Sequence, residues 1–182
     1  MPRSPALDPS KLTADQKRAY DEIAKRIPHG VVRGPFAVLL NAPALADGAI
    51  RTYTSLREAK LDRRLVELMI LIVGRFHSAQ YERFAHGPRA VEAGLAPETV
   101  EAIRHRRTPA LKREDEQLVY DVVGELMTTK RLSQGSYERA LALLGMERLV
   151  ELIAGAGFYT MVALTINAFD VEVPDGARPL PD

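Results

Sequence analysis

The run from Leu65 to Val73 constrains the fold of this 182-residue chain more than any other part of its sequence. It reads LVELMILIV, and Glu67 is the single charged residue within it. Apolar side chains at all the other positions would surround an α-helix on every side, so this helix is expected to be buried rather than to lie on the surface. Other helices must therefore pack around it.

A second helix is expected after the turn that follows this run. Along it, alanines and two ionisable residues recur at spacings of three and four, which places them on one helix face. They are Ala79, Glu82, His86, Ala90 and Ala93. Alanines at this spacing are typical of close packing, so we expect Glu82 and His86 to be neighbours and to be partly desolvated. A carboxylate beside an imidazole can carry acid/base chemistry, and an ordinary surface pair is the open alternative.

The rest of the chain predicts further helices and no strands. No stretch shows sustained alternation of apolar and polar residues, and the capping-box pattern from Thr13 to Gln16 indicates one helix start. We therefore predict an all-α fold, a single-domain helical bundle. We expect an N-terminal arm at residues 1–12, a helical domain at 13–171 and a flexible C-terminal tail at 172–182, because proline and polar residues dominate the two ends.

The last predicted helix runs from Glu147 to about Phe169, after a break at Gly145, and eighteen consecutive residues in it carry no charge. Length alone would suit a membrane span. Glycine, threonine and asparagine within the helix, and the lack of a Lys/Arg cluster after it, argue against one. We interpret it as a helix wrapped by protein, in the core or at a subunit interface, and we expect no membrane partner.

Composition excludes several classes of function. Lys+Arg 25 and Asp+Glu 24 leave a net charge of +1, which gives no electrostatic reason to expect nucleic acid as a partner. The chain has no cysteine, which excludes disulfides, thiolate metal sites and any thiol peroxidase cycle carried by this chain itself. Because the first residues contain no apolar signal core, a cytoplasmic protein is expected.

Four segments, GPFAVLLNAP, RRLVELMILIVGRF, QYERFAHGPRAVEAGL and GFYTMVALTINAF, span about residues 30–172. Together they resemble the carboxymuconolactone decarboxylase family, whose fold is shared with the alkylhydroperoxidase D proteins. In the peroxidase branch of that family, the second helix carries Cys-x-x-Cys-x-x-x-His and a glutamate lies upstream. The matching positions here hold Ala79, Glu82, His86 and Glu67. The resemblance therefore implies an alkylhydroperoxidase D-like helical fold of the cysteine-less branch.

For this branch, the resemblance implies a cofactor-free lyase or isomerase that acts on a small carboxylate or lactone by proton transfer. His86 would be the general acid/base, and Glu82 and Glu67 would orient it and tune its pKa. An arginine would hold the substrate carboxylate and a tyrosine would donate a hydrogen bond, unless the tyrosines only complete the core. The substrate-binding candidates are Tyr81, Arg83, Arg75 and Tyr159. Many relatives place tryptophan at the position of Arg83, so the pocket is expected to differ in shape.

Two other functions stay open on the sequence. The chain could be a non-catalytic oligomeric scaffold, or Glu67, Glu82 and His86 could bind a divalent metal ion. A single histidine and the lack of Glu-x-x-His spacing disfavour the metal site, so no metal and no cofactor are expected. The resemblance and the uncharged last helix predict a homo-oligomer, a trimer or a hexamer. The direction of the His86 pKa shift is undecided, because a nearby carboxylate raises that pKa and burial lowers it.

Overall fold

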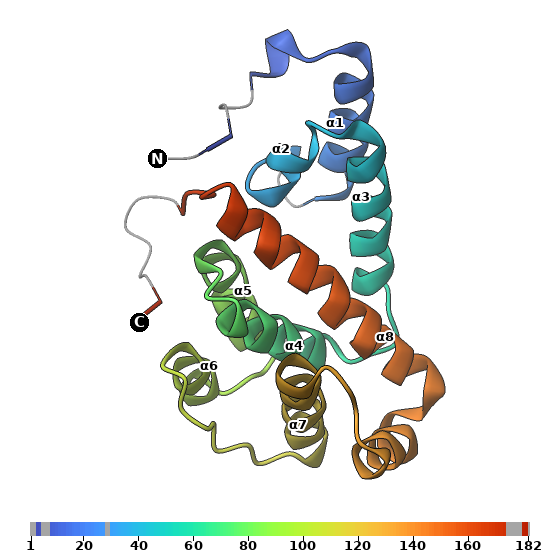
Figure 1. The fold of residues 1–182 in the computed structure, drawn as a ribbon, viewed down its shortest axis with the longest axis vertical. Coiled ribbons are helices and arrows are strands. Elements are labelled where there is room, and N and C mark those ends of the chain that lie inside the picture. Colours follow the sequence, from blue (N-terminus) through green and yellow to red (C-terminus); the bar gives the residue numbers. More distant parts are fainter. Residues whose placement is uncertain (1–2, 5–7, 28–29, 174–179, 182) are drawn as a thin grey trace. The chain divides into compact units, whose positions relative to one another are not determined.

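The structure, a computed structural model, describes residues 3–4, 8–27, 30–173 and 180–181, and every regular element within them is helical. The prediction of an all-α fold is confirmed (Figure 1). A 3₁₀ turn at Pro9–Lys11 precedes the α-helices. These are α1 (Ala14–Arg26), α2 (Pro35–Leu39), α3 (Pro43–Arg57), α4 (Arg63–Phe76), α5 (Gln80–Glu92), α6 (Pro97–Arg104), α7 (Glu114–Thr129) and α8 (Gln134–Ala168).

The helices form two compact units. One contains residues 1–58 and 165–172, with α1 packed on α3, and the other contains residues 59–164 and 173–182. In the second unit, α4 packs against α5, α6 and α7. The domain bounds predicted from the sequence stay a prediction, because the units are defined by packing in space and not by position along the chain.

The helix α4 is the buried helix that the sequence predicted. Asp62 caps it by accepting a hydrogen bond from the Arg64 backbone N–H at 2.9 Å, and every residue from Arg64 to Arg75 is buried. Capping by an aspartate satisfies one of the unpaired N–H groups of the first turn. The chain then turns through Ser78, in the left-handed region at φ 53°, and starts α5 two residues later. This tight connection makes α4 and α5 a helical hairpin.

The helix α8 bends at Gly145, where the sequence predicted a break. Gly145 has φ 76° and ψ 165°, a conformation that a side chain would strain, so two helical segments meet there. The apolar part of α8 is long enough to cross a membrane by length and composition alone, and half of it is buried within the chain. Met146, Val150, Ile153 and Leu164 are exposed. Their spacing of three, four and eleven residues places them on one face of the helix.

The flexible tail expected at 172–182 stays a prediction, but two of its residues make contacts with the helices. Leu180 is buried, its backbone N–H donates to Gln80 Oε1 at 2.6 Å, and Arg75 Nη2 donates to the Pro181 carbonyl at 2.7 Å. Both partners are polar side chains, Arg75 from α4 and Gln80 from α5. The rest of the predicted tail at 174–179 and 182, and arm residues 1–2 and 5–7, lie outside the described residues.

Candidate active site

The α4–α5 hairpin brings Glu67 and His86 together. Glu67 Oε2 lies 2.7 Å from His86 Nδ1, and both side chains are buried, with Glu67 fully inaccessible and His86 7% exposed. Arg63, one helical turn before Glu67, forms an ion pair with its other oxygen, Oε1. All three residues belong to the second unit. Glu67 therefore contacts the Arg63 guanidinium through one carboxylate oxygen and the His86 imidazole through the other, and both Glu67 and His86 are buried between α4 and α5.

The carboxylate sets the tautomer of His86. An ionised carboxylate only accepts hydrogen bonds, so Nδ1 carries the proton and donates to Glu67, which leaves the lone pair on Nε2. Nε2 makes no hydrogen bond with the described residues. The ring of Tyr159, from α8, meets the imidazole edge to face, with centroids 5.4 Å apart. Such an arrangement presents Nε2 as a proton acceptor and confines the ring between α8 and Glu67.

Burial settles the direction of the His86 shift that the sequence left open. Removal of the imidazolium from water lowers the pKa of His86 below 6.5, and the hydrogen bond that His86 donates to Glu67, which acts in the opposite direction, does not cancel this effect. Arg89 and Arg63 lower the pKa further through their positive charges. His86 is therefore a neutral base at pH 7.

Glu82 does not pair with His86, which corrects the expectation that these neighbours contact each other. Glu82 is 2% exposed, and neither of its carboxyl oxygens has a hydrogen-bond partner among the described residues. It packs instead on Gly74 of α4, where an added Cβ would lie 3.1 Å from Glu82 Oε2. Burial raises the pKa of Glu82 well above 4.5. Because Gly74 has no side chain, there is room beside it for the buried, protonated carboxyl group of Glu82.

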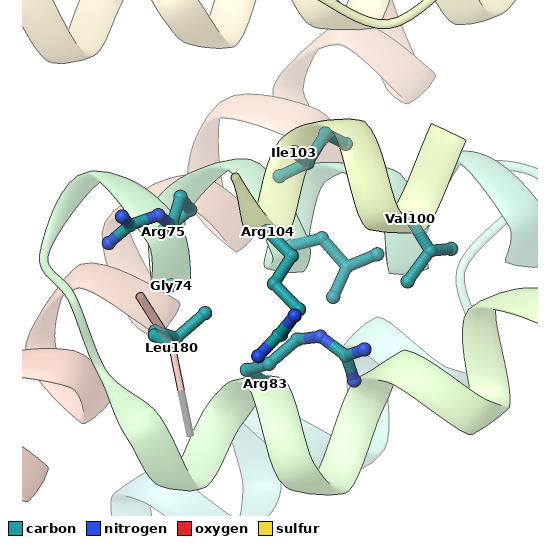
Figure 2. A pocket seen from close by; sticks show the side chains of 8 residues that line it. Gly74, Arg75, Arg83, Val100, Ile103, Arg104 and Leu180 are labelled. Atoms are coloured by element: carbon teal, nitrogen blue, oxygen red, sulfur yellow. The ribbon is translucent and has the colours of Figure 1, made fainter. Parts of the chain in front are cut away.

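The two arginines proposed to bind substrate lie at a small cavity (Figure 2). Arg75 and Arg83 line it together with Arg104 of α6, and its volume is about 10 Å³, enough for one water molecule. Arg83 Nη2 donates to Glu101 Oε1 at 3.1 Å. Gly87, one turn along α5, permits this position of Arg83, because a Cβ at Gly87 would lie only 1.8 Å from Arg83 Nη1.

Arg104 was not among the site candidates that the sequence identified. It is 5% exposed, and it lies one helical turn after Val100, which is also buried. Its spacing of four residues from an apolar position was the signal that could have identified it.

The remaining candidates take different positions. Tyr159 is buried against His86, as described above, whereas Tyr81 is half-buried and its ring contacts Phe84, with centroids 6.1 Å apart. Tyr81 is not among the residues that line the arginine cavity. Within the described ranges, no group of three or more His, Cys, Asp or Glu side chains is placed to hold a metal ion.

Comparison with known proteins supports the fold. No protein-family model matches the chain, and no curated protein matches it. Among solved structures, the chain is similar to an uncharacterized peroxidase-related protein from Silicibacter sp. TM1040, with a TM-score of 0.75 and 17% sequence identity, over 97% of this chain and 95% of that one. At this identity the similarity establishes the fold alone. The fold predicted by resemblance, alkylhydroperoxidase D-like and all-helical, is confirmed, and the chain lacks cysteine.

Proposed function

We propose that the chain is a cofactor-free lyase or isomerase that uses Glu67 and His86 as an acid/base pair on a small carboxylate or lactone. The observation that carries this proposal is the buried 2.7 Å contact between Glu67 Oε2 and His86 Nδ1. A carboxylate on Nδ1 orients the imidazole and stabilises the imidazolium that forms when Nε2 takes up a proton. The peroxidase chemistry of related folds is excluded for this chain, because it needs thiols that the chain lacks.

In the proposed reaction, His86 Nε2 removes a proton from a carbon next to the substrate carbonyl and returns it to another position. Glu67 keeps its negative charge throughout and stays bound to Nδ1. An arginine, Arg75 or Arg83, holds the substrate carboxylate by charge-assisted hydrogen bonds. Glu82, as a protonated carboxyl, would be a hydrogen-bond donor for a carbonyl or enolate oxygen. Tyr159 confines the imidazole, and Tyr81 stays a candidate for substrate contact.

The test begins with a screen of small lactones and carboxylated cyclic acids that follows substrate loss and CO₂ release. With a substrate in hand, His86→Ala should lower kcat by about 10²- to 10⁴-fold, the usual contribution of a general base. Glu67→Gln should also lower kcat, and the double variant should lose little more than His86→Ala, because the two residues act as one unit. Glu92→Gln, an exposed change on the same helix as His86, is the matched control.

The pH profile separates a catalytic role from a structural one. Since protonation of Nε2 removes the base, activity should fall on the acid side at a pH below 6.5. Glu67 raises the pKa of His86, so Glu67→Gln should move this acid limb to still lower pH. Full activity of a folded His86→Ala variant, or an acid limb that Glu67→Gln leaves in place, would show that His86 is a structural histidine.

We also propose that the chain forms a homo-oligomer, a trimer or a hexamer built from two trimers, through the exposed face of α8. Met146, Val150 and Ile153 are 53%, 55% and 40% exposed, and a contiguous apolar face of this kind is typical of an interface. Light scattering should give a multiple of the 20.1 kDa chain mass. Ile153→Glu should shift the mass toward that of one chain, while Arg148→Glu, an exposed change on the opposite face, should not. A monomeric mass of the unmodified protein at micromolar concentration would refute the proposal.

A further inference from the structure

Three contacts fix the register of the α4–α5 hairpin, and they follow one another with increasing distance from the turn. They are Gly74 with Glu82, Glu67 with His86, and Arg64 with Gly94. The two helices are therefore antiparallel, so residues before Glu67 in α4 and residues after His86 in α5 lie on the same side of the pair, away from the turn. Arg63 of α4 and Arg89 of α5 both lie on that side.

Arg89 is a close neighbour of His86. Residues three apart on a helix have Cβ atoms about 5–6 Å apart, and the positive charge of Arg89 acts on the imidazole. Arg89 is partly buried, and within the described ranges its side chain forms no hydrogen bond and no ion pair. Arg63 differs, because the Glu67 carboxylate balances its charge. Beside the imidazole, Arg89 is therefore a cation that still has its hydrogen-bond donors to offer.

The two arginines proposed above to bind substrate have other contacts. Arg83 pairs with Glu101 of α6 at 3.1 Å, and Arg75 Nη1 donates to Ser78 Oγ at 3.1 Å. Both line the arginine cavity, and His86 is not among the residues that line it. The imidazole is therefore no part of that cavity, whereas Arg89 is one helical turn from the imidazole.

We propose that Arg89 holds the carboxylate of a small substrate while His86 Nε2 faces the reacting carbon. The inference rests on the proposed function, and it replaces Arg75 and Arg83 by Arg89 as the residue that binds the carboxylate. A guanidinium presents parallel N–H groups that match the two oxygens of a carboxylate, so this contact gives orientation as well as affinity. Holding the carboxylate limits where the reacting carbon can lie, which proton transfer to Nε2 requires.

A bound carboxylate would also change the basicity of His86. The charged and titratable groups around the imidazole are Glu67 and Arg63 from α4, Glu82 and Arg89 from α5, Tyr159 from α8, and the Arg83–Glu101 ion pair between α5 and α6. Burial has the largest effect on the pKa of His86 and lowers it, and the charges of Arg89 and Arg63 lower it further. A carboxylate on Arg89 neutralises one of these charges, so the pKa of His86 should rise when the anion binds.

An NMR titration of the full chain with sodium propanoate, which follows the ring protons of histidine, tests the proposal. His86→Ala assigns the His86 signals, because they are the ones among the four histidines that disappear. Propanoate should shift the His86 signals and raise the pKa of His86. Propanamide has the same shape and no charge, so it should do neither.

Variants of Arg89 measure its part in the binding. Arg89→Gln should raise the Kd for propanoate by about ten-fold or more, since it removes a hydrogen bond between two charged groups. Arg89→Lys keeps the positive charge and should lose less affinity than Arg89→Gln. The matched control is Arg107→Gln, which removes an exposed arginine outside the site and should leave the Kd unchanged. Circular dichroism checks that each variant remains helical.

Several results would overturn the proposal. An unchanged Kd in folded Arg89→Gln would show that Arg89 is a surface cation that only favours the C-terminal end of α5. A higher Kd in Arg75→Gln or Arg83→Gln, with Arg89→Gln unaffected, would assign the carboxylate to the arginine cavity instead. Equal effects of propanamide and propanoate, or His86 signals that propanoate does not shift, would also contradict a carboxylate beside the imidazole.

Failure of this inference can be told apart from failure of the proposed function. Propanoate binding that depends on Arg89, together with no turnover in the substrate screen, would contradict the proposed reaction and support the carboxylate site. Turnover that is lost in His86→Ala but keeps its kcat and KM in Arg89→Gln would support the reaction and overturn the site.

Discussion

Replacement of Arg64 by alanine should lower the free energy of unfolding by about 3–5 kcal/mol, the cost of leaving buried charges without their partner. Arg64 is 6% exposed at the start of α4, and its guanidinium binds Glu116 Oε1 at 2.5 Å and Asp115 Oδ2 at 2.6 Å. Both carboxylates lie in the first turn of α7. The arginine therefore holds together the N-terminal ends of two helices whose faces form the centre of the second unit.

Chemical denaturation of Arg64→Ala measures this effect, with Arg107→Ala as an exposed control that should change the unfolding free energy by less than about 0.5 kcal/mol. The unfolding free energy that Arg64→Ala loses should be smaller at acidic pH. Burial would raise the pKa of Asp115, but its hydrogen bonds to Arg64 and Arg113 outweigh this and lower it below 3.8. A lowered carboxyl pKa stabilises the folded state above 3.8, and this contribution disappears as the pH falls through the folded-state pKa. A loss under about 1 kcal/mol at neutral pH would mean that water reaches these charges.

The second large effect is a pH-dependent gain in stability from Glu82→Gln. The raised pKa of Glu82 means that the folded protein keeps a proton that the unfolded chain releases above pH 4.5. Folding then takes up a proton, so the stability of the unmodified protein falls as the pH rises from 4.5 toward the folded-state pKa, by up to about 1.4 kcal/mol per pH unit. Glutamine has no such proton. The free energy of unfolding of the variant, relative to that of the unmodified protein, should therefore increase steadily as the pH rises above 4.5.

The comparison isolates Glu82 from the other buried titrating group. The lowered pKa of His86 acts in the opposite direction, since stability falls as the pH drops below 6.5, but His86 is present in both proteins and cancels in their difference. Denaturation curves at several pH values on both sides of 4.5 give that difference, and Glu92→Gln controls for the loss of one negative charge. A difference that is the same at every pH would contradict a protonated Glu82 in the folded state.

Several features of this protein follow from the sequence alone, because they depend on neighbours along one helix. The uninterrupted apolar run of α4 required burial on all sides, and every residue from Arg64 to Arg75 is buried. The spacing along α5 identified a close-packed face, on which Ala79, Glu82, His86 and Ala90 are all buried. The positive φ of Gly145 is likewise where the sequence indicated a break. The spacing of residues along a helix predicts which side chains share a face, and this depends only on the sequence of that one helix.

Only the tertiary structure decided which groups meet across elements. The register of α4 against α5 places Glu67 opposite His86 and Gly74 opposite Glu82, so the carboxylate four residues away on the same helix is not the partner of the imidazole. The depth of burial decided the direction of the His86 pKa shift, where two opposing effects could not be weighed from the sequence. The position of α6 brought Arg104 to Arg83, and polar groups of α4 and α5 held Leu180 and Pro181. These contacts join residues that are distant in the chain, and helical periodicity carries no information about them.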